Sequence, residues 1–64
     1  MIRPAVLAGP TDQAWRVREM AARVIARRQL GEALTGVAEL RDDPVPRVRA
    51  AAARAVTILT AAQA

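Results

Sequence analysis

Arginine is the residue type in this 64-residue sequence with the most evident chemistry. There are ten arginines and no lysine or histidine, against six acidic residues, so the formal net charge is +4. A guanidinium group stays protonated and forms paired hydrogen bonds with carboxylates and phosphates, so it suits anion binding better than proton transfer. The candidate binding arginines, which recur at helical spacing, are Arg16, Arg23, Arg27, Arg47 and Arg54.

The residue types that usually carry catalysis are missing. Only thirteen types occur, and Cys, His, Ser, Lys and Tyr are not among them. This excludes a thiolate nucleophile, an imidazole base and the common zinc ligand sets. The threonine hydroxyls have no His or Lys to activate them, and the adjacent Asp42 and Asp43 precede a proline and are explained most simply as a helix cap. We therefore expect no enzymatic activity, no cofactor and no metal site.

The elements that must position the arginines follow a repeat of 31 residues. Shifting the chain by this period aligns residues 11–23 with residues 42–54. The identical pairs are Asp12/Asp43, Arg16/Arg47, Val17/Val48, Arg18/Arg49, Ala21/Ala52, Ala22/Ala53 and Arg23/Arg54. A period in this range is typical of solenoids, in which each unit buries its apolar face against its neighbours.

Both copies of the repeat have the apolar periodicity of helices. One apolar arc holds Ala14, Val17, Ala21, Val24 and Ile25, and the other holds Val48, Ala52, Ala55, Val56 and Leu59, with the candidate arginines opposite. Turn and capping residues precede both copies, and Pro46 suits a first helical position. The pattern predicts helices over about 13–28 and 46–62.

A shorter helix of about ten residues is predicted between Leu30 and Arg41, with Gly31 in the turn before it. Gly36 weakens this helix by about 1 kcal/mol relative to Ala, so packing must stabilise it. Residues 4–8 are expected to form one further turn. The sequence thus predicts a single all-α domain over 1–64, a short α-solenoid fragment of three helices and an N-terminal turn, with units at about 1–29 and 30–62.

Residues 33–56 resemble a HEAT-type helical repeat nearly end to end: a leucine-spaced helix, an Asp-Pro turn, then Val-Arg and an alanine-rich helix. The period is shorter than the ~40–47 residues of long HEAT and armadillo repeats. The chain is therefore similar to the short HEAT-like repeats of phycobilin lyases and many bacterial scaffold proteins. Thr35 departs from the proline that the family often has, and the first unit lacks a full first helix. The resemblance covers about residues 11–62 and implies about one and a half repeats.

The resemblance also implies roles for particular residues. In this family the turn aspartate and the Val-Arg arginine commonly form a ladder of ion pairs and hydrogen bonds between stacked units. Carried over, this assigns Asp12 with Arg18, and Asp43 with Arg49, to structure. The second helices of such repeats line a concave surface, where the five candidate arginines would form a basic stripe. The alternative is that these arginines form a solvated face that keeps an alanine-rich protein soluble.

Two apolar residues accompany the candidate arginines. Trp15, beside Arg16, is either an anchor for a partner or, in the interpretation we favour, a staple that closes the first unit. Met20 shares the face of the stripe with Ile58. Apolar side chains among the arginines favour contact with protein over contact with nucleic acid.

Three functions remain open at this point. The first is a non-catalytic interaction or scaffold module that binds an acidic protein surface. The second is sequence-independent binding of nucleic acid by the same stripe. The third is a terminal piece of a longer solenoid with no ligand of its own.

Composition and length predict a compartment and an assembly. The longest uncharged stretch, residues 55–64, is shorter than the about 20 residues of a membrane span, and the first residues lack a signal-peptide core. We expect a cytoplasmic protein with no membrane partner, and the Ala- and Arg-rich composition is typical of GC-rich bacteria. Fewer than two repeats leave apolar ends, so self-association or packing against further repeats is expected.

Overall fold

The computed structural model describes residues 13–63, and within that range the chain is built from helices without β-strands. The α-helices are α2 (Trp15–Arg28), α3 (Leu34–Glu39) and α4 (Pro46–Gln63), and the 3₁₀ turns are η2 (Gly31–Ala33) and η3 (Leu40–Asp42). The predicted all-α fold with three helices is confirmed. The expected turn at residues 4–8 lies outside the described residues.

The two long helices have nearly the predicted bounds. Pro46 is the first residue of α4, where its missing N–H has no helical partner to lose. Helix α2 ends at Arg28, and its C-cap residue Gln29 adopts the left-handed conformation at φ 53°. The backbone N–H of Leu30 then donates to the carbonyl oxygen of Ile25 at 3.1 Å. The left-handed residue is therefore Gln29 and not Gly31, which keeps a negative φ.

The middle segment differs from the prediction of one helix of about ten residues. It is divided into η2, α3 and η3. Short 3₁₀ turns are common at helix ends, and here they continue the helical direction at both ends of α3. The segment still buries one apolar side chain from each part, namely Ala33, Val37 and Leu40. Packing thus positions this segment, although its backbone is not one regular helix.

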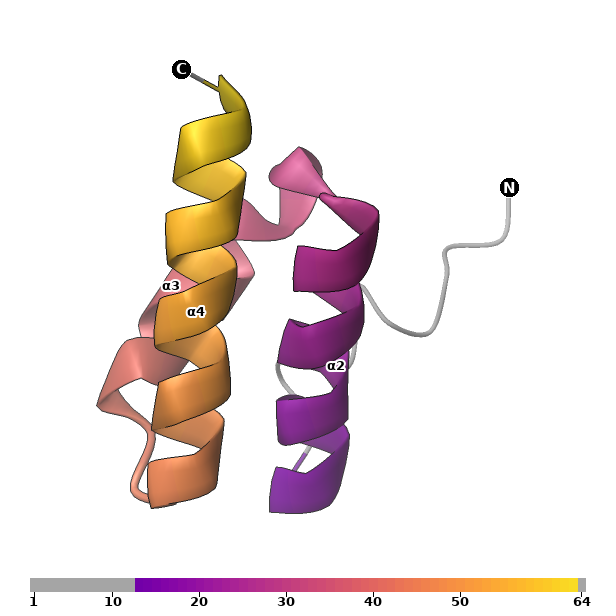
Figure 1. The fold of residues 1–64 in the computed structure, drawn as a ribbon. Coiled ribbons are helices and arrows are strands. Elements are labelled where there is room, and N and C mark those ends of the chain that lie inside the picture. The colour runs from indigo at the N-terminus through magenta and orange to yellow at the C-terminus, as the bar shows by residue number, and fades with distance from the viewer. Residues whose placement is uncertain (1–12, 64) are drawn as a thin grey trace.

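Helices α2 and α4 lie side by side and run in the same direction, and α3 packs against α4 (Figure 1). The fully buried large side chains at the centre are Ile25, Val37, Val48 and Leu59. Burial of each such side chain contributes about 1.5–3 kcal/mol. The same core cluster includes the alanines Ala22, Ala33, Ala52 and Ala55. No helix in the described part of the chain is both long enough and apolar enough to cross a membrane.

The two predicted apolar arcs have different environments. The arc of α4 is buried at Val48, Ala52, Ala55 and Leu59. On α2 the arc is only partly buried, because Ala14 is exposed and Val17 is 42% exposed. Ala21 and Ile25 are the buried members of this arc, and Ala22, which lies outside the arc, joins Ile25 in the core. The buried face of α2 is therefore rotated away from half of its predicted arc.

Candidate functional site

A charged contact joins α2 to the turn before α4. Arg18 donates from Nε to Oδ2 of Asp43 at 2.7 Å and from Nη2 to Oδ1 at 3.2 Å. Asp43 is only 7% exposed, and its Oδ1 also accepts the backbone N–H of Val45 at 2.9 Å. The hydrogen bond from Arg18 is the largest cause that lowers the pKa of Asp43, and burial opposes it. This paired geometry fixes the distance between the two halves of the molecule.

The structure corrects the pairing expected for the structural ladder. The carboxylate of Asp43 binds Arg18 of the preceding unit and not Arg49. Arg49 Nη1 instead donates to the backbone carbonyl oxygens of Asp43, at 2.9 Å, and Pro44, at 3.3 Å. Arg49 lies one turn into α4 and reaches back over the turn to its carbonyls, whereas the carboxylate faces α2. Asp12 lies outside the described residues.

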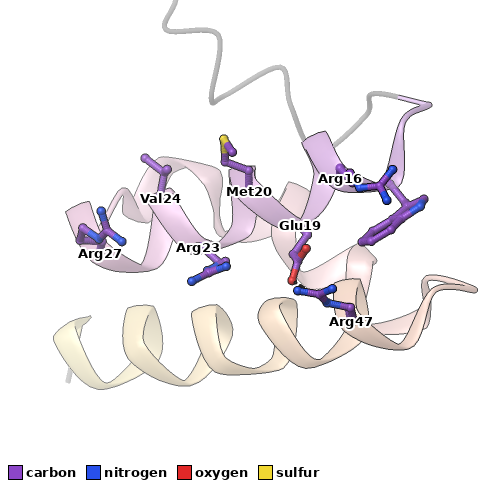
Figure 2. A pocket seen from close by; sticks show the side chains of 8 residues that line it. Arg16, Glu19, Met20, Arg23, Val24, Arg27 and Arg47 are labelled. Carbon is purple, nitrogen blue, oxygen red and sulfur yellow. Dashed lines mark ion pairs between the residues drawn. The ribbon is translucent and has the colours of Figure 1, made fainter.

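A groove follows α2 and α4 on one side of the molecule. One hollow of about 460 Å³ is lined by Trp15, Arg16, Glu19, Met20, Arg23, Val24, Arg27 and Arg47 (Figure 2). An adjoining hollow of about 250 Å³ lies between the two helices and is lined by Arg23, Ala26, Arg27, Ala51, Arg54 and Ile58. We call the two hollows together the α2–α4 groove. All five candidate arginines line it.

Two of the five arginines are already engaged within the chain. Arg47 of α4 lies 3.4 Å from Oε2 of Glu19 on α2, measured from its Nε (Figure 2). The guanidinium carbons of Arg16 and Arg47 lie 4.7 Å and 5.8 Å from the ring centroid of Trp15, within cation–π range. Glu19 is the site residue that the sequence analysis missed. Its repeat counterpart is Ala50, and this departure from the repeat was the available signal.

The other three arginines are available to a ligand. Arg23, Arg27 and Arg54 are exposed, and within residues 13–63 they make no ion pair, hydrogen bond or ring contact through their side chains. In Figure 2, Arg23 extends from α2 toward α4. These uncompensated charges border the apolar side chains of Ala26, Ala51 and Ile58.

Trp15 and Met20 have different positions at the groove. Trp15 is half-buried and packs against the core, and its ring also borders the larger hollow. Both its proposed roles, staple and anchor, are compatible with this position. Met20 is 66% exposed, and in Figure 2 it points away from α4 together with Val24. Met20 therefore lies at the outer rim of the groove, whereas Ile58 is half-buried inside it.

The groove has the chemistry of an anion-binding surface. Among residues 13–63 the one carboxylate that lines the groove, that of Glu19, is paired with Arg47. Across residues 13–63 no three acidic side chains gather closely enough to hold a metal ion. Thr57 is one of the threonines considered above as nucleophiles, and its hydroxyl donates to the carbonyl oxygen of Ala53 at 3.1 Å within its own helix. Guanidinium groups beside apolar side chains bind carboxylates or phosphates without changing them.

No protein-family model, curated protein or solved structure matches this chain. The geometry of the groove is therefore the basis for assigning a function.

Proposed function

We propose that this chain is a non-catalytic protein-interaction module that binds an acidic protein surface in the α2–α4 groove. One observation carries the proposal: Arg23, Arg27 and Arg54 are exposed and have no side-chain partner within residues 13–63. Their charge attracts carboxylates, and the arginine fork suits paired hydrogen bonds. The apolar side chains between them favour a protein ligand, because apolar contacts add to the affinity for another protein's side chains.

The proposal includes the architecture of a scaffold. Helices α2 and α4 would be the second helices of successive HEAT-like units, in about one and a half repeats of a solenoid. Three observations support this: the register of 31 residues, the common direction of α2 and α4, and the contact between Arg18 and Asp43 across the two units. Such a scaffold would work in the bacterial cytoplasm and pack against further repeats or copies.

The groove can be tested by reversing its charge. We expect Arg23→Glu combined with Arg54→Glu to weaken binding to a synthetic acidic peptide by about tenfold or more, which is about 1.4 kcal/mol. The probe carries a leucine at every fourth position, and fluorescence anisotropy measures its affinity. Arg28→Glu combined with Arg41→Glu is the matched control, because both residues are exposed, lie outside the groove lining and change the net charge equally. Equal affinities for both double variants would exclude the groove as the binding site.

A second probe separates protein binding from nucleic-acid binding. Duplex DNA held by the arginines would give a log–log salt slope of about 0.9 per phosphate contact. Retention of DNA without retention of the peptide would replace the proposal with nucleic-acid binding. Binding of neither probe would favour a solenoid piece with no ligand of its own. A peptide with alanine in place of leucine should bind less tightly at the same charge, because it loses the apolar contacts.

A further inference from the structure

One face of α4 is the repeat copy of the face that α2 buries inside the chain. Ala22 and Ile25 of α2 are both 0% exposed. Their counterparts 31 residues later, Ala53 and Val56, are exposed and half-buried. Helix α4 therefore carries residues of the same types as the buried face of α2, but the rest of the chain does not fully cover them.

Conversely, one face of α2 is the repeat copy of a face that α4 buries inside the chain. Val48 and Ala55 of α4 are 0% exposed within the core. Their counterparts 31 residues earlier are Val17, which is 42% exposed, and Val24, which is half-buried. Each long helix thus carries a repeat copy of one side of the internal packing that is exposed in part; on α2 the exposed or half-buried members are Val17 and Val24, whereas Ala21 between them is only 3% exposed.

Arg49 supplies an independent polar observation on the open face of α4. Arg18 donates from Nη1 to the carbonyl oxygen of Gln13 at 2.7 Å, and Arg49 donates from Nη1 to that of Pro44, the register counterpart of Gln13, at 3.3 Å. The same backbone contact thus orients both guanidinium groups. Arg18 uses its Nε and Nη2 to bind Asp43, whereas these two groups of Arg49 have no acceptor among residues 13–63.

We propose that the two open faces bind each other between copies of this chain. The face of α4 marked by Arg49, Ala53 and Val56 would pack on the face of α2 marked by Val17 and Val24 in a second copy. This contact repeats the existing packing between units, with Arg49 in the role of Arg18. The occupant is a second copy because this chain itself carries both complementary faces.

The contact is heterologous, since different faces meet, so copies would stack head to tail instead of closing as a symmetric dimer. This inference rests on the packing against further copies in the proposed function. It does not depend on the ligand of the α2–α4 groove. Val24 borders both the groove and the open face of α2, but Arg49, Ala53, Val56 and Val17 do not line the groove. The two substitutions tested below, at Ala53 and Val17, therefore leave the groove lining intact, and the two ideas can fail separately.

The experiment mixes two chains that are each blocked on one face. Ala53→Glu places a charge on the open face of α4, and Val17→Glu places one on the open face of α2. Sedimentation velocity at several concentrations should show wild-type species whose mass rises with concentration, and monomers for each variant alone. An equimolar mixture of the variants should form a dimer and nothing larger, because one intact α4 face then meets one intact α2 face.

Two controls keep the result interpretable. Both substituted positions are exposed, and circular dichroism should show unchanged helix content. Thr35→Glu on α3 and the groove variant Arg27→Glu should associate as the wild-type chain does. A wild-type monomer at every concentration would overturn the inference, and so would association of either blocked variant alone. If the mixture of the two variants contained only monomers, the head-to-tail contact would also be excluded.

Discussion

Helices α2 and α4 share the ordered string Arg-Val-Arg-x-x-Ala-Ala-Arg, yet equivalent positions on the two helices differ in burial. Ile25 is inaccessible on α2, whereas its counterpart Val56 is only half-buried on α4. Arg18 binds a buried carboxylate, whereas its counterpart Arg49 binds only carbonyl oxygens of its own turn. This difference indicates that the contribution of a residue to stability depends on whether its repeat unit has a neighbouring unit on that side. In stacked repeats, much of that contribution comes from the neighbouring unit.

The largest expected difference between the helices concerns the matched pair Ile25 and Val56. Ile25→Ala should lower the free energy of unfolding by about 2–5 kcal/mol, because it opens a cavity in the core. Val56→Ala should cost clearly less, because its side chain is half-buried and loses less packing. Urea unfolding followed by circular dichroism measures both. Similar losses of stability at the two positions would contradict the interpretation that Ile25 is packed on all sides whereas Val56 is packed only in part.

The next largest effect is expected at the contact between the two units. Asp43→Asn leaves the guanidinium of Arg18, whose side chain is 15% exposed, without its carboxylate, so the chain should be destabilised. Asp42→Asn next to it is the control, because an exposed surface substitution usually changes stability by less than about 0.5 kcal/mol. Thermal unfolding of both variants compares them. A midpoint for Asp43→Asn equal to that of Asp42→Asn would mean that the contact contributes nothing to stability.

The same contact predicts a dependence on acid. The pKa of Asp43 is lowered in the folded chain by its hydrogen bond with Arg18, whereas in the unfolded chain it is about 4. The folded chain binds this proton less readily, so the stabilisation is complete above the unfolded pKa and is lost as the pH falls through the folded one. We expect a smaller loss of stability on acidification for Asp43→Asn than for the wild-type chain. If the stability of the wild-type chain and that of Asp43→Asn fell equally with decreasing pH, the acid dependence could not be assigned to Asp43.

The smallest effect is expected at the groove. Glu19→Gln removes the ion pair with Arg47, whose side chain is 69% exposed, so stability should fall by less than about 1 kcal/mol. Removing the carboxylate also leaves one more groove arginine uncompensated. The acidic peptide described above should therefore bind Glu19→Gln more tightly than the wild-type chain, as measured by anisotropy. Weaker binding would show that Glu19 organises the groove instead of competing with the ligand.

Much of the fold could be predicted because helical signals are local. Apolar spacing and the proline at position 46 gave the bounds of the long helices to within about two residues. The division of the middle segment was not predictable in this way, since 3₁₀ and α turns share nearly the same apolar spacing. The sequence placed Gly31 in the turn after the first long helix, and the left-handed residue in that turn is Gln29.

Part of the site could also be predicted from the repeat. The register placed five arginines on one side of two parallel helices, where they line the groove. It did not reveal that Glu19 and Trp15 engage Arg47, because those contacts join side chains of two different helices.

The sequence by itself determined that this chain is helical, that it repeats every 31 residues and that arginine dominates its charge. These properties follow from residue type and spacing alone. Only the tertiary structure decided which of two equivalent faces is buried, that Asp43 pairs with Arg18, and which arginines have no partner within the described residues. The physical reason is that burial and ion pairing depend on what lies opposite a side chain, and two units with similar sequences have different neighbours.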